Sequence, residues 1–338
     1  MSVSDNEVIL RTEGLTRHYD EIKALTNLDL EIRRGEIFGY IGHNGAGKTT
    51  TIRILAGLLR PSSGSASIAG VNVVDGRDRI KRLVGYMPDN FGVYEQMRVW
   101  EYLDFFGAAF GIGRRRRRER IEEVIDMTEA HYMHDRFVDT LSRGMKQRVG
   151  IARTLMHDPQ VLLLDEPASG LDPRARVHMR QLLRRLADAG KTLLVSSHIL
   201  PELAAVCDSI GILHGGVLRA VGPIAEVLAS LRRHRLMEVR LLGDVEKTVG
   251  LLRENDKCKN VERSEESDNV VNFNFTGDDG ELATILNGLV RSDLGVVTCR
   301  EVPLTLEEAY MTVSGFEGEL EKEGQEEQSS QQSAVSSQ

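Results

Sequence analysis

One short segment of the 338-residue chain, "GHNGAGKT" at residues 42–49, constrains the fold more than any other feature. It fits the pattern G-x-x-x-x-G-K-[ST] and lies between an apolar run that predicts a strand and a stretch that predicts a helix. Glycines let backbone N–H groups surround phosphate oxygens, and the helix presents its positive N-terminus to them. This context disfavours the alternative, an ordinary glycine-rich turn. We therefore predict a phosphate-binding loop formed by Gly42, His43, Asn44, Gly45, Ala46, Gly47, Lys48, Thr49 and Thr50.

The side chains that would act on a bound phosphate come from three segments. The Lys48 ammonium supplies a point charge for the β- and γ-phosphates of a nucleotide, and the Thr49 hydroxyl is a suitable Mg²⁺ ligand. The apolar run "VLLL" ends in Asp165 and Glu166. This predicts that Asp165 holds Mg²⁺ and that Glu166 orients or deprotonates an attacking water. His198, at the end of "LLVSSH", is a further candidate, although a histidine at this place is often only structural.

Hydrophobic patterns predict an α/β fold for the first part of the chain. Residues 7–35 alternate like antiparallel strands, whereas "QVLLLDEP" and "KTLLVSSH" are continuous apolar runs, typical of parallel strands buried on both faces. Helices between such strands indicate a mostly parallel sheet. We predict a phosphate-loop (RecA-like) domain over residues 1–230, with an antiparallel β subdomain and an inserted α-helical subdomain at about residues 92–158.

The pattern changes after about residue 230. The order β-α-ββ-α-β with a closing helix predicts a small ferredoxin-like α+β domain over residues 236–315, without a catalytic constellation and with an accessory or regulatory role. Residues 316–338 are rich in Glu, Gln and Ser and are predicted to be disordered. They carry a charge of −5 out of the net −8, so the rest of the chain is nearly balanced. This balance gives no case for nucleic-acid binding.

Several other sequence features are explained by ordinary structural roles. Cys207, Cys258 and Cys299 are odd in number and lack metal-like spacing, which predicts buried, reduced thiols in a cytoplasmic protein. The absence of a signal pattern or an apolar run of about 20 residues predicts that the chain does not itself cross a membrane.

The run Arg114–Arg118 predicts a solvated helix start, with contact to anionic lipid or nucleic acid as the alternative. One aromatic set is expected to be mostly core: Phe91, Tyr94, Trp100, Tyr102, Phe105, Phe106 and Phe110.

The order of motifs resembles that of the ATP-binding-cassette (ABC) ATPases. The phosphate loop is followed by "LSRGMKQR", "LLLDEP", "SGLD" and "SSH", so the resemblance covers roughly residues 7–222. A single cassette with a short α+β extension looks like the separate ATPase subunits of export-type transporters. The resemblance implies that two copies close head to tail around two Mg-ATP. Each ATP would then lie between the phosphate loop of one copy and the "LSRGM" signature turn of the other.

The resemblance also implies roles for individual residues. Tyr19 matches the aromatic residue that stacks on adenine, although it could be a core residue of its strand. Ser142 and Gly144 match the signature residues that reach the partner's γ-phosphate. Asp172 matches the residue that links the two sites of the dimer, and His198 matches the switch that contacts the γ-phosphate.

Two departures from the usual family pattern are relevant to function. The usual signature is Leu-Ser-Gly-Gly-Gln, and here Arg143 and Met145 stand at its third and fifth positions. Because the serine and the second glycine remain, we expect little loss. Asp89 stands in "GYMPDN" where a glutamine is usual. A carboxylate is a competent Mg²⁺ ligand, so we keep Asp89 as a candidate metal residue.

These observations predict an ATP-hydrolysing subunit that works as a homodimer on a separate membrane permease. It would lie in the cytoplasm, attached peripherally to the inner face of the membrane through that permease, and the direction would be export. The aromatic set lies where the family receives the permease's coupling helix. The main alternative is a soluble, non-transport ABC ATPase with a regulatory or sensing role. An ABC protein of translation or DNA repair would typically carry two cassettes or a coiled-coil insertion, and neither is visible.

Overall fold

The computed structural model describes residues 7–314, except residues 93, 95, 232, 233, 265, 266, 293 and 303. The chain divides into two compact units. The first contains the described residues up to Val227 together with Val313 and Ser314, and the second is Leu228–Thr312. Each unit has its own hydrophobic core. The tail that we predict to be disordered, residues 316–338, lies outside the described residues.

Within the described part of the first unit, a six-stranded sheet has the order β10-β9-β3-β8-β7-β6. Neighbouring strands from β9 to β6 are parallel, and only β10 pairs antiparallel, with β9. Every residue of β3, β7 and β8 is buried, as expected for strands covered on both faces. The predicted α/β fold with a mostly parallel sheet is confirmed. The strands are β3 Ile37–Ile41, β6 Val84–Met87, β7 Val161–Asp165, β8 Thr192–Ser197, β9 Ser209–His214 and β10 Val217–Pro223.

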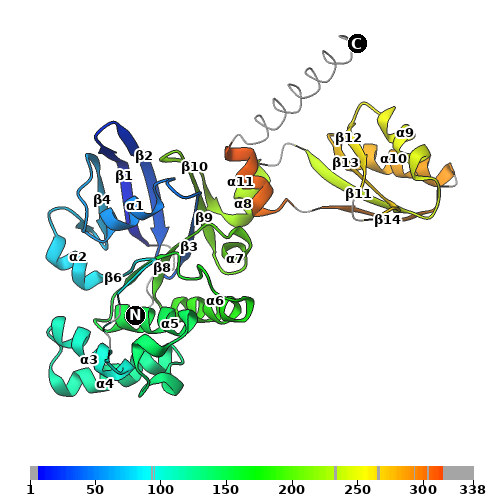
Figure 1. The fold of residues 1–338 in the computed structure, drawn as a ribbon. Coiled ribbons are helices and arrows are strands. Elements are labelled where there is room, and N and C mark those ends of the chain that lie inside the picture. Colours follow the sequence, from blue (N-terminus) through cyan, green and yellow to red (C-terminus); the bar gives the residue numbers. More distant parts are fainter. Residues whose placement is uncertain are drawn as a thin grey trace, which may run out of the picture. The chain divides into compact units, whose positions relative to one another are not determined.

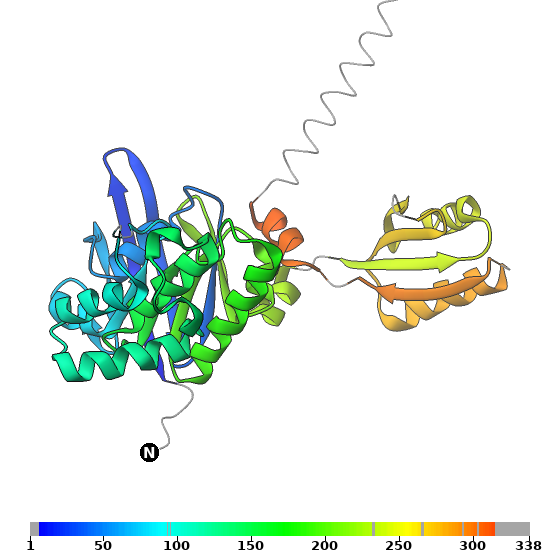
Figure 2. The ribbon, with the colours of Figure 1, turned by 60° about the horizontal axis from the view of Figure 1, so that its bottom comes forward.

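A second, antiparallel sheet of the first unit has the order β2-β1-β4-β5 among the described residues. Its apolar side chains join the core that also contains Ile52 and Leu55, which follow the phosphate loop. The hairpin β1–β2 and the helices α3 and α4 lie at opposite ends of this unit in both ribbon views (Figure 1 and Figure 2). The strands are β1 Val8–Tyr19, β2 Ile22–Arg33, β4 Ser63–Ile68 and β5 Val71–Asn72.

The helices connect these strands. We expected the helix after the phosphate loop to continue to Pro61, but it ends at Leu55, because Gly57 takes a left-handed conformation with φ of 70°. Among the described residues, no helix is both long and apolar enough to cross a membrane. The helices are α1 Lys48–Leu55, α2 Arg77–Leu83, α3 Val99–Ala109, α4 Arg114–Met127, α5 Arg143–Leu155, α6 Pro173–Asp188, α7 Leu200–Ala204 and α8 Ile224–Leu231, with 3₁₀ turns at His131–Met133 and Val138–Thr140.

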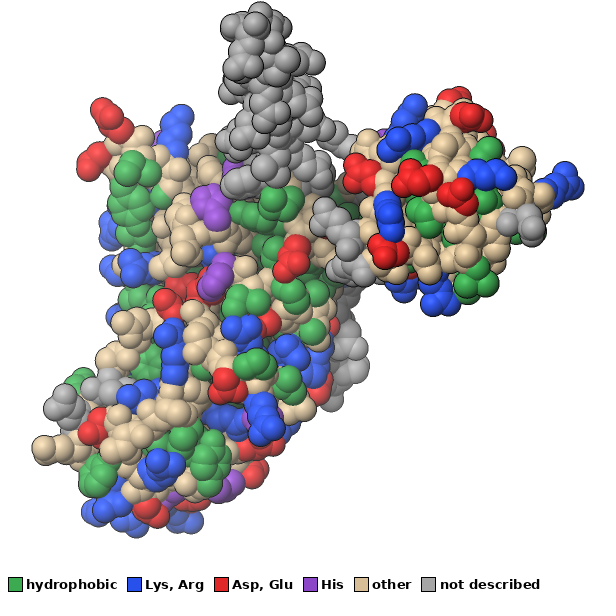
Figure 3. All heavy atoms as spheres, turned by 45° about the vertical axis from the view of Figure 1, so that its right-hand side comes forward, with side chains coloured by type: hydrophobic (Ala, Val, Ile, Leu, Met, Phe, Trp, Pro, Cys, Tyr) green, Lys and Arg blue, Asp and Glu red, His purple; other side chains and the backbone are tan. Residues whose placement is uncertain are grey.

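The arginine run at the start of α4 is only partly the solvated helix start that we expected. Arg117 is 16% exposed, and its guanidinium makes a two-pronged ion pair with Asp104 of α3. Arg116 remains exposed and pairs with Glu123 on its own helix. On the face drawn in Figure 3, Lys and Arg side chains over this helical part are interspersed with Asp and Glu. The run therefore holds α3 and α4 together and forms ion pairs with nearby carboxylates.

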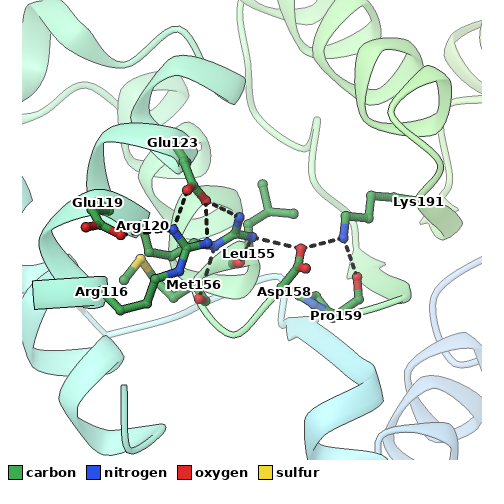
Figure 4. A network of polar contacts seen from close by, with 9 residues as sticks. All are labelled: Arg116, Glu119, Arg120, Glu123, Leu155, Met156, Asp158, Pro159 and Lys191. Atoms are coloured by element: carbon green, nitrogen blue, oxygen red, sulfur yellow. Dashed lines mark hydrogen bonds and ion pairs between the residues drawn. The ribbon is translucent and has the colours of Figure 1, made fainter. Parts of the chain in front are cut away.

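One turn further along α4, Arg120 joins three segments (Figure 4). Its side chain is 9% exposed and donates hydrogen bonds to the carbonyls of Leu155 and Met156. These carbonyls lie at the C-terminal end of α5, where helix carbonyls lack partners within the helix. Arg120 also contacts Asp158, and a hydrogen bond from Lys191 lowers the pKa of that carboxyl. The network fixes the end of the helix that Ser142 begins.

In the second unit, the described strands have the order β12-β13-β11-β14 and are all antiparallel. Figure 1 shows α9 and α10 on the same side of this sheet, and their apolar residues form the core with those of the strands. This is the predicted ferredoxin-like arrangement. The elements are β11 Arg235–Leu241, α9 Val245–Arg253, β12 Cys258–Arg263, β13 Val270–Phe275, α10 Asp279–Arg291, β14 Val296–Glu301 and α11 Leu306–Ser314.

The three cysteines, all among the described residues, are free thiols. Cys207 and Cys258 are buried as predicted, whereas Cys299 is only partly buried. Burial raises the pKa of the Cys258 thiol to about 11, so this thiol is protonated and unreactive at neutral pH.

Candidate active site

The phosphate loop connects β3 to α1. At two of its positions, backbone atoms of other segments come so close that only glycine fits. Gly47 has φ of 112°, and a Cβ added there would lie 2.5 Å from the carbonyl oxygen of Ala24. A Cβ at Gly42 would lie 2.7 Å from the carbonyl oxygen of Leu213. Because neither neighbour is a flexible side chain, only glycine lets the loop close against the strands here. The buried Ala46 then leads into the first turn of α1.

Lys48 begins α1, and its side chain folds back onto the loop. The residue is 6% exposed, and Nζ donates to the carbonyl oxygens of Gly42, at 2.5 Å, and His43, at 3.3 Å. Nζ also lies 3.4 Å from Oε1 of Glu166, which follows β7. The ammonium group is therefore held at the mouth of the loop, where a phosphate group would take it over from these oxygens.

Thr49 and Asp165 lie together, as the sequence predicts. The Thr49 hydroxyl donates to Oδ2 of Asp165 at 2.8 Å, and the Ser196 hydroxyl donates to Oδ1 at 2.6 Å. Asp165 is 2% exposed, so these two hydroxyls orient a buried carboxylate. Adjacent hydroxyl and carboxylate oxygens are ligands that Mg²⁺ prefers, so the donor set fits this ion. In the described part of the chain, no group of three or more His, Cys, Asp or Glu side chains could hold a metal. This is compatible with Mg²⁺, which usually takes one or two carboxylates and completes its shell with water and substrate phosphate.

Glu166 occupies a strained position at the end of β7. Its φ of 51° is left-handed, a conformation that is costly for a non-glycine residue and is found preferentially at functional sites. The backbone N–H donates to Ser196, both to its hydroxyl at 3.0 Å and to its carbonyl at 3.2 Å, which holds this conformation. Oε2 accepts from Nδ1 of His198 at 2.7 Å. Oε1 is buried and faces Lys48, and it has no hydrogen-bond partner among the described residues.

Ser196 is the site residue that sequence reasoning missed. It precedes His198 by two positions and lies directly opposite Asp165 in the parallel pairing of β7 and β8. Its hydroxyl contacts both Asp165 and the backbone of Glu166. The available signal was a hydroxyl residue directly after the apolar run Leu193–Val195 of a buried strand, where a polar side chain needs a partner.

The signature turn is a separate feature of the same unit. Ser142 caps α5, and its Oγ accepts from the backbone N–H of Met145 at 3.4 Å. A Cβ at Gly144 would lie 3.3 Å from Cβ of Ala175, so the turn packs closely against the start of α6. Asp172 caps α6 and accepts from the N–H of Ala175 at 2.9 Å. Ser142, Gly144 and Asp172 thus form one group, and within the described residues no hydrogen bond or ion pair joins them to Lys48 or Thr49.

Asp89 and Tyr19 lie apart from the phosphate loop's contacts. Oδ1 of Asp89 is 4.0 Å from the Arg143 guanidinium, and both side chains are more than half exposed. The described contacts of Asp89 include no hydrogen bond or ion pair with Thr49 or Asp165, so its metal role stays a prediction. Tyr19 ends β1 with its ring 38% exposed, and the Arg17 guanidinium lies 4.6 Å from the ring centroid. Its role toward adenine likewise stays a prediction.

The aromatic set is not mostly core, contrary to our expectation. Only Tyr102 is fully buried, whereas Tyr94, Trp100, Phe105 and Phe110 are exposed. Phe110 and Phe106 help to line an apolar groove of about 380 Å³ between α1, β6 and the helical part. Periodicity identified an apolar face correctly, but this face is largely uncovered. The other lining residues are Ala56, Leu58, Lys81, Val84, Tyr86, Pro88, Arg153, Thr154 and His157.

Comparisons with known proteins identify the family of the chain. A sequence model of the family described as "ABC transporter" matches residues 25–169. An uncharacterized ABC transporter ATP-binding protein of Synechocystis is 39% identical over 68% of this chain and 64% of its own length. The bacitracin transport ATP-binding protein BcrA of Bacillus licheniformis is 37% identical over 72% of this chain and 78% of its own length.

A solved structure extends the likeness to three dimensions. The ATP-binding cassette MJ0796, in a dimeric post-hydrolysis state bound to ADP and Pi, matches with a TM-score of 0.57 and 27% sequence identity. The match covers 64% of this chain and 99% of that one. The likeness to BcrA over more than two thirds of that protein, together with the family match, is decisive. The chain belongs to the ABC transporter ATP-binding proteins.

Proposed function

We propose that this chain binds and hydrolyses Mg-ATP as the ATP-binding subunit of an ABC transporter. The observation that carries the proposal is the convergence of two side chains on the Glu166 carboxylate, where Oε2 accepts from His198 and the buried Oε1 faces Lys48. A carboxylate held in this way beside a phosphate loop is placed to act on a water molecule. The catalytic group is thus Glu166, with Lys48 and His198 as its neighbours.

The proposed reaction uses these groups in a defined order. A γ-phosphate entering the loop takes the Lys48 ammonium from Glu166 and from the loop carbonyls. Glu166 then accepts a proton from a water molecule, whose oxygen attacks the γ-phosphorus while the bond to the leaving ADP breaks. His198, hydrogen-bonded to Glu166 and 46% exposed on its side chain, fixes the carboxylate and is available to the γ-phosphate.

Thr49 and Asp165 would hold Mg²⁺, with Asp89 as a further candidate. When bound, this ion would neutralise part of the negative charge of the phosphate groups. Ser196 supports the arrangement because its hydroxyl orients Asp165. Tyr19 would stack on the adenine ring, for which its half-exposed position at the end of β1 is suitable.

We further propose that two copies of the chain close head to tail. The support is that Ser142, Gly144 and Asp172 form a packed group of their own, with no described contact to the phosphate loop of the same chain. The Ser142 hydroxyl accepts one bond, and its own proton is not used in that bond. At the N-terminus of a 13-residue helix, such a turn suits an anion brought by another molecule.

The partner of this dimer would be a separate membrane permease. The apolar groove lined by Phe106 and Phe110 supports this proposal, because an exposed apolar surface is typical of a docking site for another protein. The subunit would lie in the cytoplasm, attached to the inner face of the membrane through the permease, and the transport would be export. Residues 236–315 would form an accessory domain outside a cassette of about residues 1–230.

The test is a Mg²⁺-dependent ATPase assay on the purified full-length chain. We expect the wild type to release phosphate from ATP, and Glu166→Gln to bind ATP but turn over more slowly by at least about a hundredfold. Glu119→Gln, an exposed carboxylate on α4, is the matched control and should keep the wild-type rate. Full turnover by Glu166→Gln would remove Glu166 from the mechanism. Recovery of the native protein from detergent-solubilised membranes with a polytopic partner tests the transport assignment.

A further inference from the structure

Glu202 is a buried acid that the proposed mechanism does not use. It lies in α7, four residues after His198, and is 6% exposed. Both carboxylate oxygens are buried and accept no hydrogen bond among the described groups. Burial raises the pKa of this carboxyl, and the nearby charges of Arg176, Arg180 and His198 oppose that effect, whereas Glu166 adds to it. A carboxylate in such a place is costly, so stability alone does not explain it.

The described ion pair of Glu202 leads to the turn that carries Asp172. Nε of Arg176, in the first turns of α6, lies 3.0 Å from Oε1 of Glu202. The same Nε–H donates to the carbonyl oxygen of Leu171 at 2.9 Å. Leu171 directly precedes Asp172, and its side chain is the neighbour of Gly144 in the signature turn. Arg176 therefore connects the segment after His198 with the turn at Asp172.

A small cavity lined in part by Glu202 also includes residues of the catalytic segments. It has a volume of about 20 Å³, enough for one water molecule. Its walls include Pro167, which follows Glu166, and Ser197, which precedes His198. Glu202 thus lines the same cavity as the residues next to Glu166 and His198 in the sequence. A shift of α7 would be transmitted to these segments and, through Arg176, to Leu171.

We propose that Glu202 and Arg176 are positioning residues that make the His198 segment and the Asp172 turn move as one. The buried carboxylate holds the guanidinium, and the guanidinium holds the carbonyl of Leu171. Resting on the proposed function, this means that the group sensing the γ-phosphate and the group facing the second copy of the chain are mechanically linked. The pair makes no contact with substrate and would act only through His198, Asp172 and their neighbours.

The experiment compares Glu202→Gln, Arg176→Lys and the double variant in the full-length protein. Glutamine keeps the shape of Glu202 but removes its charge. Lysine keeps the charge of Arg176 but lacks the planar guanidinium with its several N–H donors. Arg185→Gln on the same helix α6 is the matched control, because Arg185 is partly exposed and pairs with Glu129 away from the site. The readouts are kcat and KM for Mg-ATP, the dissociation constant for ADP, and the melting temperature.

We expect each single variant to lower kcat by about tenfold to a hundredfold, since a small misplacement of catalytic groups costs this much. KM and the ADP dissociation constant should stay within about twofold of the control, because the phosphate loop is untouched. The melting temperature should stay within about 3 °C of the control. Because both residues act through one link, the double variant should be no slower than the slower single variant.

Three results would overturn the inference: single variants with the kcat of the control, fold-losses that multiply in the double variant, or weakened ADP binding alongside a lowered melting temperature. The last result would indicate a general structural role. If Glu202→Gln does not fold, Arg176→Lys decides alone, because this side chain is 34% exposed and its replacement is better tolerated. A wild-type protein without ATPase activity would instead refute the proposed function.

Discussion

Replacing Glu166 by glutamine should tighten the binding of ADP as well as slow hydrolysis. Nζ of Lys48 lies 3.4 Å from Oε1 of Glu166, and both side chains are largely buried. A nucleotide phosphate has to take Lys48 away from this carboxylate. The attraction between the two residues therefore opposes binding, and so does the repulsion between the carboxylate and the phosphates. Glutamine removes both the attraction to Lys48 and the repulsion of the phosphates. Each of these two changes should strengthen the binding of ADP.

The size of the effect follows from the distance. Two unit charges 3.4 Å apart attract by about 5 kcal/mol at an effective dielectric constant of about 20. Most of this attraction is offset by the cost of removing both groups from water. Lys48 also keeps its hydrogen bonds to the carbonyls of Gly42 and His43 when the charge of Glu166 is gone. A net change of about 1–2 kcal/mol remains, which corresponds to a dissociation constant about 5 to 30 times lower.

The assay is a calorimetric titration of the full-length protein with Mg-ADP, which avoids turnover. Glu119→Gln again serves as the control, because it removes one negative charge from an exposed side chain of α4 that is distant in sequence from both Lys48 and Glu166. The protein without nucleotide should also unfold at a lower temperature in the Glu166→Gln variant, since Lys48 then lacks its charged partner. ADP affinity that is unchanged or weaker in Glu166→Gln, with the control at the wild-type value, would refute this reasoning.

Four further predictions concern other parts of the chain. In a Glu166→Gln background, Mg-ATP should hold two chains together in sedimentation, and adding Ser142→Arg should abolish this dimer while ATP still binds the monomer. Asp89→Ala should raise the Mg²⁺ concentration needed for half-maximal hydrolysis if Asp89 serves the metal, whereas unchanged dependence would leave it a loop residue. A chain ending at about residue 230 should remain soluble and bind ATP by calorimetry. Arg120→Met should lower the free energy of unfolding by about 2–4 kcal/mol in urea titrations, because two buried carbonyls lose a charged donor.

The parts of the fold that the sequence predicts well are those specified by local pattern. A parallel strand covered on both faces is largely apolar, so β7 and β8 are each recognisable by an uninterrupted run of apolar residues. The phosphate loop is recognisable from eight consecutive residues, although the backbone atoms that require Gly42 and Gly47 belong to Leu213 and Ala24, which are distant in sequence. The proximity of Asp165 to Thr49 then follows from topology, since the parallel strands β3 and β7, on either side of β8, end at the same edge of the sheet.

The sequence alone does not predict contacts between segments that are distant along the chain. Ser196 was overlooked because its importance arises from the register that sets it opposite Asp165. Glu202 resembles any acidic residue of a short helix until the fold buries it against Arg176. For polar residues, the partner decides whether a side chain is structural, functional or merely solvated, and that partner is fixed only by tertiary packing.

The arginine run and the aromatic set illustrate this limit from opposite directions. Five consecutive arginines suggest a solvent-exposed helix face. Arg117 is nevertheless largely buried, because both carboxylate oxygens of Asp104 in α3 accept hydrogen bonds from its guanidinium. Helically spaced aromatic residues suggest a core, yet Phe105 and Phe110 are each 43% exposed because no described element covers that side of α3. Periodicity states which face of a helix is apolar, but not what covers it. An apolar face that no described element covers is therefore typical of a surface that binds another molecule, and it is not evidence of a fault in packing.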